Sequence, residues 1–181
     1  MSETKKENIV VLIDVQNLYH SSVYYGGSKV SYKKLMEKIT AGRNLLQAKA
    51  YAAHKDGKST KAFYKALDVL GIKVSSKYIH LRKVENQANP VKVIPVHFDV
   101  EISVDALCAP QETNTIVLCS GNGNFEYLVD QLMDEGMNVE VWSFKESTSE
   151  RLIKKAKFVQ IPKECLLSTA DEEKTEKVQT A

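Results

Sequence analysis

Short apolar runs of strand length alternate with helix-like segments along most of this chain. The runs NIVVLID (8–14) and TIVLCS (115–120) are almost continuously apolar, and more mixed strand-like runs span 45–53, 72–81 and 137–144. A strand that is apolar along its whole length is buried on both faces, which is typical of a parallel sheet covered by helices. The sequence therefore predicts an α/β fold with a central, mostly parallel sheet of about five to six strands.

Helical patterns separate these strand-like runs. Segments 31–42, 59–71 and 125–136 are predicted to be helices, and each finishes at a glycine, which is a common helix terminator. A further helix is predicted to begin near Phe98. Segment 84–97 has spaced prolines and weak periodicity, so we predict a long loop there.

The length and composition fit one globular domain. The chain has 181 residues, of which 43% are apolar and 27% charged, and this composition excludes a disordered or fibrous chain. We predict a domain over 8–167, a flexible polar N-terminal tail over 1–7 and a disordered C-terminal tail over 168–181. A net charge of +2 is too small to indicate nucleic-acid binding by itself.

The sequence also bounds the expected location. No apolar run approaches the roughly 18 residues of a membrane span, and no apolar stretch follows the first lysines as it does in a secretory signal. The cysteines Cys108, Cys119 and Cys165 are odd in number and widely spaced, which fits a reducing environment rather than a disulfide framework. We therefore expect a cytoplasmic protein that does not enter a membrane.

Polar residues follow two of the predicted strands, at the ends where parallel α/β sheets bind ligands. Asp14 ends the first run, and the segment 120–124 (SGNGN) ends and follows the run at 115–120. A local role explains both features as well, because aspartate suits a helix N-cap and the glycines with asparagine suit a tight turn. The glycines do not have the spacing of a dinucleotide-binding fingerprint.

Three carboxylates lie at the start of the helix predicted after Phe98. Glu101 and Asp105 share a face of an ideal helix, whereas Asp99 lies about 120° away from Asp105. The three therefore cannot converge on one ion from a regular helix. An acidic first turn that favours the helix dipole explains Asp99 as well.

Hydroxyl and basic residues surround the predicted strand ends. Segment 147–149 (STS) before Glu150 has the pattern of a helix N-terminus, whose amides could hold a phosphate. Lys145 and Arg151 lie beside it, and further lysines follow the run at 45–53. A basic rim around an acidic centre suits a polyanion cut by metal-held water, although lysines on helix surfaces are usually only solvated.

Five motifs in order resemble the NYN domain, in its LabA-like branch, of the PIN-like nuclease superfamily. They are Ile-Asp-x-x-Asn-Leu, Asp-Val-x-x-x-x-Asp-Ala-Leu, Ser-Gly-x-x-x-Phe, Gly-x-x-Val-x-Val-Trp and Ser-Thr-Ser with a following Leu. The resemblance runs from about Asn8 to Pro162. It implies a compact three-layer α/β/α sandwich with a central parallel sheet. It also implies a ribonuclease whose clustered carboxylates hold Mg²⁺ or Mn²⁺.

The resemblance also implies roles for individual residues. The residues expected in the catalytic site are Asp14, Asn17, Asp99, Asp105, Asn122 and Asn124. Of these, Asp14, Asp99 and Asn122 are expected to hold the metal ion, while Asn17 orients water or substrate. With the basic residues added, the expected substrate contacts are Ser120, Thr148, Ser149, Lys145 and Arg151.

One departure from the family pattern bears on the chemistry. The family usually has Ser-Gly-Asp-x-Asp-Phe, and this chain has Asn122 and Asn124 where those aspartates stand. Asparagine keeps an oxygen ligand but lacks the charge, and Mg²⁺ is usually held by carboxylates and water. We therefore expect a weakened metal site.

Two main functions follow from these expectations. The first is a metal-dependent nuclease of single-stranded RNA, weakened at its metal site. The second is an inactive nuclease-like domain that binds RNA or a protein partner without cutting. A phosphate-binding α/β domain unrelated to nucleases is a third, and the lack of a glycine-rich first turn disfavours it. The sequence leaves open whether the chain forms a homodimer.

Overall fold

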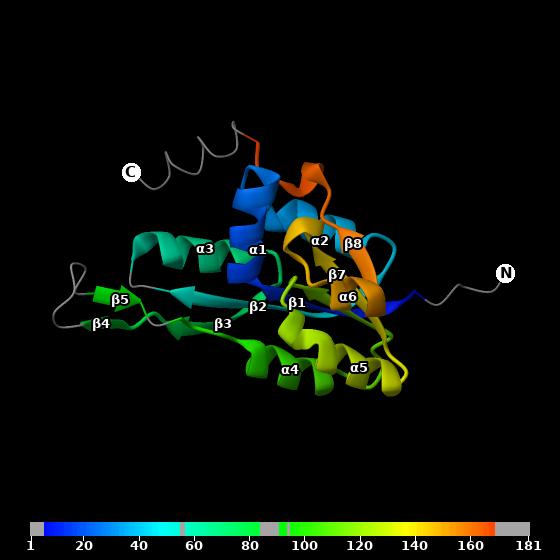
Figure 1. Cartoon of the computed structure of the whole chain (residues 1–181). Helices are drawn as coiled ribbons and strands as arrows, with labels where there is room; N and C mark the ends of the chain where they lie inside the picture. The colour runs from blue at the N-terminus through cyan, green and yellow to red at the C-terminus, as the bar shows by residue number, and fades with distance from the viewer. Residues whose placement is uncertain (1–5, 55–56, 84–90, 94, 169–181) are drawn as a thin grey trace.

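Six parallel strands form the central sheet of the computed structural model, which describes residues 6–54, 57–83, 91–93 and 95–168 (Figure 1). The strand order is β3-β2-β1-β6-β7-β8. Their bounds are β1 Asn8–Asp14, β2 Asn44–His54, β3 Lys73–Tyr78, β6 Thr115–Cys119, β7 Asn138–Ser143 and β8 Lys157–Gln160. The predicted parallel sheet is confirmed. Its strand order reverses between β1 and β6, the position where sheets of this class bind ligands.

Helices cover both faces of the sheet, which confirms the three-layer α/β/α sandwich. One face carries α1 (Val15–Ser21), α2 (Tyr32–Thr40) and α3 (Lys58–Val69), and the other carries α4 (Asp99–Leu107) and α5 (Glu126–Asp134) (Figure 1). Helix α1 continues directly into a π-helix, Ser22–Gly26. A short helix, α6 (Glu150–Lys155), precedes β8.

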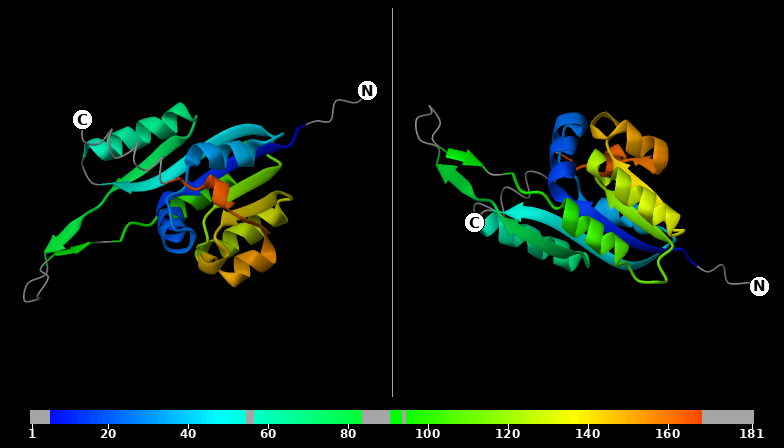
Figure 2. Two further views of the ribbon diagram at one scale, coloured as in Figure 1. Left: turned by 90° about the horizontal axis from the view of Figure 1, so that it is seen from above. Right: turned by 60° about the horizontal axis from the view of Figure 1, so that its bottom comes forward.

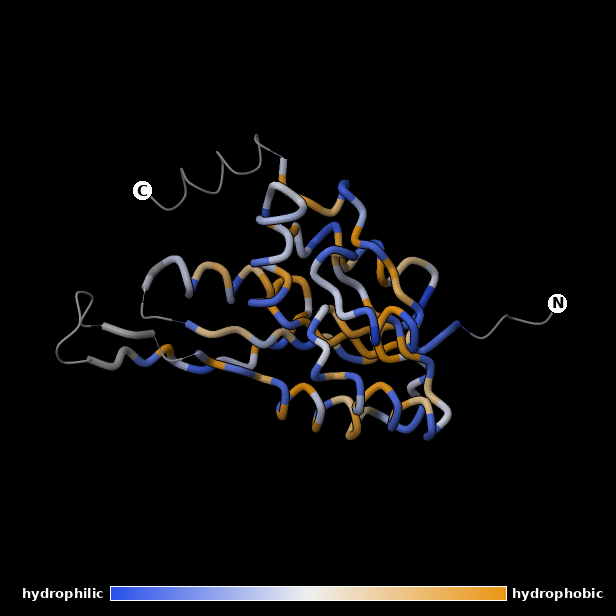
Figure 3. Tube along the Cα trace, viewed as in Figure 1, coloured by the Kyte–Doolittle hydropathy of each residue, from blue (hydrophilic) through white to orange (hydrophobic). Residues whose placement is uncertain are grey.

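Strand β1 is apolar along its length because alternate residues enter two different hydrophobic cores. Ile9, Val11 and Ile13 pack with residues of α1, α2 and α3, whereas Val10 and Leu12 pack with residues of α4 and α5. All five side chains are fully buried. Figure 3 shows the most hydrophobic segments gathered at this centre of the molecule. The buried strand holds its carboxyl end, and therefore Asp14, in a fixed place.

The structure corrects the prediction for the segment after β3. The strand predicted over 72–81 divides into β3 and a separate short strand, β4 (Leu81–Lys83). Strand β5 (Val91–Val93) lies within the predicted loop 84–97 and pairs antiparallel with β4. Residues 84–90 and 94 of that loop lie outside the described residues. The Val-Lys-Val alternation favours an extended strand, because β-branched residues suit strands.

The predicted tails 1–7 and 168–181 lie almost entirely outside the described residues. Glu7 is described, and its carbonyl accepts a hydrogen bond from the Asn44 amide at 2.8 Å. Its carboxylate accepts a hydrogen bond from the Thr115 hydroxyl at the start of β6. Within the described part of the chain, no helix is long and apolar enough to cross a membrane.

Strands β2 and β3 extend beyond the end of β1. Asp14 lies opposite Tyr51 of β2, and β2 continues for three more residues to His54, which pairs with Tyr78 of β3. Figures 1 and 2 show these two strands and the β4–β5 hairpin projecting from the body of the sheet. The carboxyl edge of the sheet is therefore stepped, with Asp14 at the inner corner.

Candidate functional site

Asp14 connects the ends of β1 and β6. It is the N-cap of α1, and its Oδ1 accepts a hydrogen bond from the Asn17 amide at 3.1 Å. Its Oδ2 accepts a hydrogen bond from the hydroxyl of Ser120, 3.1 Å away, in the loop after β6. The Asp14 side chain therefore both caps α1 and contacts the loop at the carboxyl end of β6.

Asn17 fixes the same loop from the other side. Its Oδ1 accepts a hydrogen bond from the backbone amide of Gly121 at 2.9 Å. A Cβ added at Gly121 would lie 2.8 Å from the Ser147 carbonyl oxygen and 3.0 Å from the Ser143 hydroxyl. A side chain does not fit there, so glycine at 121 is required for the close approach of the loop after β6 to the end of β7 and the loop that follows it.

The two asparagines of the loop meet Asp99 at the start of α4. Asn122 donates from Nδ2 to Oδ1 of Asp99 at 3.2 Å, and Asn124 donates from Nδ2 to Oδ2 at 2.8 Å. The Asn122 amide also donates to the Ser120 hydroxyl at 3.2 Å. Hydrogen bonds therefore run without a break from Asp14 through Ser120 and Asn122 to Asp99.

The electrostatics of Asp14 reflect this arrangement. Burial raises the pKa of Asp14 above its usual value, and hydrogen bonds from the Asn17 amide and the Ser120 hydroxyl oppose the rise. The negative charge of Asp99 raises the pKa of Asp14 further, and His97 lowers it. The two carboxylates, from segments 85 residues apart in the sequence, are therefore close enough to repel each other.

Asp105 takes no part in this hydrogen-bonded network. It lies about 9 Å further along α4 than Asp99, by the helical rise of ~1.5 Å per residue. Its carboxylate pairs with Lys49 at 2.5 Å and accepts a hydrogen bond from the Tyr51 hydroxyl at 2.6 Å. The structure thus separates Asp105 from the other predicted acids, as ideal helix geometry requires.

The residues predicted to contact substrate differ in their exposure and in the groups that they bind. The Ser149 amide donates to the Gly121 carbonyl at 3.0 Å, which places Ser149 beside the loop. Thr148 is buried, and its hydroxyl donates to the Phe144 carbonyl at 2.7 Å, so this hydroxyl faces the protein. Lys145 is exposed, while Arg151 forms a surface ion pair with Glu126 at 3.2 Å.

A cavity of about 590 Å³ opens beside Asp99. Its lining residues are Lys77, His97, Asp99, Val100, Glu101 and Asn124. Lys77, at the end of β3, pairs with Glu101 at 2.5 Å and donates to the His97 carbonyl at 2.8 Å. Sequence reasoning missed Lys77. Its position at a predicted strand end was the available signal, but the extension of β3 past β1 was not visible.

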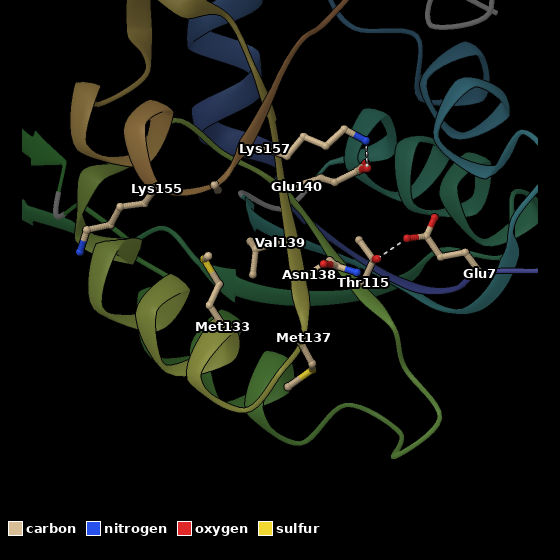
Figure 4. Close-up of a pocket in the computed structure, with 10 residues that line it drawn as sticks. Glu7, Thr115, Met133, Met137, Asn138, Val139, Glu140, Lys155 and Lys157 are labelled. Carbon is tan, nitrogen blue, oxygen red and sulfur yellow. Dashed lines mark hydrogen bonds and ion pairs between the residues drawn. The ribbon is translucent and has the colours of Figure 1, made fainter.

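A second cavity of about 400 Å³ lies at the opposite, amino-terminal edge of the sheet, around the starts of β6 and β7 (Figure 4). Its Glu140 is buried and binds Lys157 at 2.7 Å, Trp142 at 2.9 Å and Arg43 at 3.0 Å. This charge is already neutralised by its neighbours. Ligands of open parallel sheets bind at the carboxyl edge, so this cavity is not the candidate site.

The donor atoms at the carboxyl edge are of the kind that hard divalent cations bind. They comprise two carboxylates and one hydroxyl, from Asp14, Asp99 and Ser120, and the side-chain amides of Asn122 and Asn124, whose nitrogens face Asp99. Among the described residues, no group of three or more acidic, histidine or cysteine side chains is arranged to hold a metal. The residues therefore fit Mg²⁺ or Mn²⁺ in chemical type. Only Asp14 and Asp99 would contribute negative charge, and the asparagine side chains would have to rotate to present their oxygens to the ion.

The comparisons with known proteins agree with this geometry. The crystal structure of a protein of unknown function from Vibrio parahaemolyticus is similar, with a TM-score of 0.77 and 28% sequence identity over 92% of this chain and 100% of that one. No curated protein matches the chain. The NYN domain model matches residues 8–162. The chain therefore belongs to the NYN domain family of the PIN-like nuclease superfamily.

Proposed function

We propose that this chain is a metal-dependent RNA nuclease whose site lies between the carboxyl ends of β1 and β6. The observation that carries the proposal is the continuous path of hydrogen bonds from Asp14 through Ser120 and Asn122 to Asp99. It brings two acids from distant segments to one corner of the sheet, at the strand ends where sheets of this class bind ligands, and membership of the NYN family supports a nuclease-like role for them. We expect the substrate to be single-stranded RNA and the location to be the cytoplasm.

Each residue of the site has a distinct part in this proposal. Asp14 and Asp99 would hold Mg²⁺ or Mn²⁺, together with the amide oxygen of Asn122. When bound, such an ion polarises a phosphodiester and lowers the pKa of water. Asn17 and Ser120 keep the Asp14 carboxylate in place, because each contributes a hydrogen bond to it. Ser149, whose amide donates to the Gly121 carbonyl, would contact a substrate phosphate, and the exposed Lys145 would supply a positive charge to it.

A second candidate function is supported by one specific contact. Both carboxylate oxygens of Asp99 accept a hydrogen bond from an asparagine amide group. These neutral donors satisfy the carboxylate without a cation, which favours a domain that binds RNA without cutting it. The two candidates differ in whether a divalent cation displaces the amide groups.

Cleavage of single-stranded RNA in the presence of Mn²⁺ tests the proposal. We expect Asp14→Asn and Asp99→Asn to abolish cleavage, since each removes one of two carboxylates. Asp134→Asn, at an exposed position at the end of α5, is the matched control and should cleave like the unmodified protein. If the unmodified protein cleaves no faster than Asp14→Asn but still binds RNA, the second candidate replaces the first.

A further inference from the structure

Lys77 lies at the carboxyl end of β3, on the face of the sheet that α4 covers. Val74 of β3 packs with residues of α1, α2 and α3, and side chains alternate along a strand, so Lys77 points to the opposite face. There its ammonium lies 2.5 Å from the carboxylate of Glu101 in α4, and its side chain lines the cavity of about 590 Å³ beside Asp99. Lys77 and Asp99 therefore face the same open space.

Three groups from the segment that contains Asp99 hold the Lys77 ammonium in place. It donates to the His97 carbonyl at 2.8 Å, pairs with Glu101 and lies 4.8 Å from the centre of the Phe98 ring. These groups lie within two positions of Asp99 in the sequence, on both sides of it. The ammonium is therefore fixed close to Asp99 and does not sweep freely through solvent.

The Lys77 ammonium can still bind a ligand. Two oxygen acceptors take up two of its three N–H bonds, which leaves one for an anion in the cavity. The Lys77 side chain is 41% exposed and that of Glu101 is 36% exposed, so a ligand can reach the pair. Of the described residues that line this cavity, Lys77 is the only one with a permanent positive charge. An anion that enters the cavity therefore meets Lys77 as its cationic partner.

Glu101 competes with such an anion for Lys77. Carboxylates and phosphates both accept charge-assisted hydrogen bonds from an ammonium, so a phosphate can take the place of Glu101. An exposed ion pair contributes little to stability, so its exchange for a phosphate costs little. Asp105, one turn further along α4, is held differently, because it binds the Tyr51 hydroxyl as well as Lys49.

We propose that Lys77 binds the phosphate next to the scissile one in the RNA substrate, and that it exchanges Glu101 for this phosphate. The inference rests on the proposed function and adds a substrate-binding residue to it. A cation between Asp14 and Asp99 would neutralise these two acids, and Glu101 would then be the carboxylate in the cavity that still opposes the phosphate. Glu101 thus limits how tightly the RNA is held.

Binding of a fluorescein-labelled single-stranded RNA, measured by anisotropy in EDTA at several salt concentrations, tests the inference. We expect Lys77→Met to weaken binding about five-fold and Lys77→Arg, which keeps the positive charge, to restore most of it. The slope of log affinity against log salt concentration should fall by about 0.7 in Lys77→Met, the loss of one phosphate contact on a single strand. Lys73→Met is the matched control and should keep both values, because Lys73 is exposed on the same face of β3 at the opposite edge of the sheet.

Two variants of α4 separate competition at Lys77 from a general effect of charge. Glu101→Gln and Asp105→Asn each remove one negative charge, one helical turn apart, and each releases a lysine from its ion pair. We expect Glu101→Gln to bind the RNA about three-fold more tightly, because the released Lys77 lies in the cavity. Asp105→Asn should bind it like the unmodified protein, because Lys49 lies outside the residues that line the cavity.

The outcomes separate this inference from the proposed function. If RNA binds and Lys77→Met behaves like Lys73→Met, Lys77 contacts no phosphate and the inference is wrong, while the site at Asp14 is unaffected. If Glu101→Gln and Asp105→Asn tighten binding equally, Glu101 does not compete for Lys77. If the unmodified protein binds no RNA, the proposed function and the inference both fail.

Discussion

Asn124 donates a hydrogen bond from its side-chain nitrogen to Oδ2 of Asp99 at 2.8 Å. Asn122 makes the corresponding contact to Oδ1 at 3.2 Å. The family pattern has aspartates at both positions, and two further carboxylates there would face Asp99 instead of donating to it. With aspartates at these positions, a cation would be needed to offset the repulsion between the carboxylates. With asparagines, neutral amide groups satisfy the hydrogen-bonding capacity of Asp99 instead.

The double variant Asn122→Asp/Asn124→Asp should convert the site to a strong cation site. Without metal it should be less stable than the unmodified protein, because four carboxylates then crowd one corner of the sheet. With Mn²⁺ it should bind at least about ten-fold more tightly and gain more thermal stability, since bound ligand stabilises the folded state by mass action. Isothermal calorimetry and thermal unfolding with and without Mn²⁺ measure both effects.

Asn138→Asp provides the control for this double variant. Asn138 is exposed at the start of β7, at the opposite edge of the sheet, so its variant should leave Mn²⁺ affinity unchanged. Tight Mn²⁺ binding by the unmodified protein, equal to that of the double variant, would show that the amide groups do not weaken the site.

Asp105→Asn should reduce stability without affecting RNA cleavage. Burial opposes the shift, but hydrogen bonds from Lys49 and Tyr51 lower the pKa of Asp105 below its usual value of 3.8. The stabilisation is therefore complete at neutral pH and is lost as the pH falls below that value. The side chain is about a quarter exposed, so we expect a loss of about 1 kcal/mol in the free energy of unfolding.

Urea unfolding near neutral pH, and again at acidic pH, checks this prediction. The difference between Asp105→Asn and the unmodified protein should shrink in acid. The prediction is wrong if Asp105→Asn has normal stability but does not cleave RNA in an assay where the unmodified protein does. Asp105 would then be a residue of the active site.

Glu140→Gln should destabilise the fold without changing the candidate site at the carboxyl edge of the sheet. Burial opposes the shift, but hydrogen bonds from Lys157, Trp142 and Arg43 lower the pKa of Glu140. Glutamine keeps the shape and loses the charge, which leaves Arg43 without its buried partner at the amino-terminal edge. We expect a loss of about 1–3 kcal/mol in the free energy of unfolding, with RNA binding unchanged when both are measured below the unfolding transition. Weaker RNA binding by the folded variant would implicate this edge of the sheet.

How far the sequence predicts this site depends on which structural rule each residue follows. Asp14 and Ser120 follow the rule that parallel strands end at one edge of the sheet, so their place at that edge was predictable from the apolar runs, whereas their contact also depends on the pairing of β1 with β6. The contact of Asn122 and Asn124 with Asp99 needed the family resemblance, because α4 is not a neighbour of that loop in the sequence.

Other residues depend on tertiary detail that no local pattern carries. The inward direction of the Thr148 hydroxyl depends on the Phe144 carbonyl, which accepts its hydrogen bond. The position of Lys77 depends on strand register: β1 ends opposite Tyr51, and β2 continues to His54. Register is set by packing across the sheet, so the sequence predicts the strands but not their relative lengths at the edge.

Gly121→Ala should disrupt the site through the backbone. An added Cβ would lie 2.8 Å from the Ser147 carbonyl oxygen and 3.0 Å from Cα of Thr148, so one loop must move. We expect a loss of about 1–3 kcal/mol in the free energy of unfolding, typical of an overpacked position. The Gly121 amide also binds Asn17, which lies one turn from Asp14, so RNA cleavage should fall more than stability explains.

Gly57→Ala is the matched control for Gly121→Ala. A Cβ at Gly57 meets only the Ser59 hydroxyl at 3.8 Å, an ordinary contact, and the backbone at Gly57 is extended. This variant should keep both stability and cleavage. Thermal unfolding and RNA cleavage are to be measured on both variants. Equal behaviour of the alanines at 57 and 121 would mean that the loop at Gly121 does not pack closely against the segment 143–148.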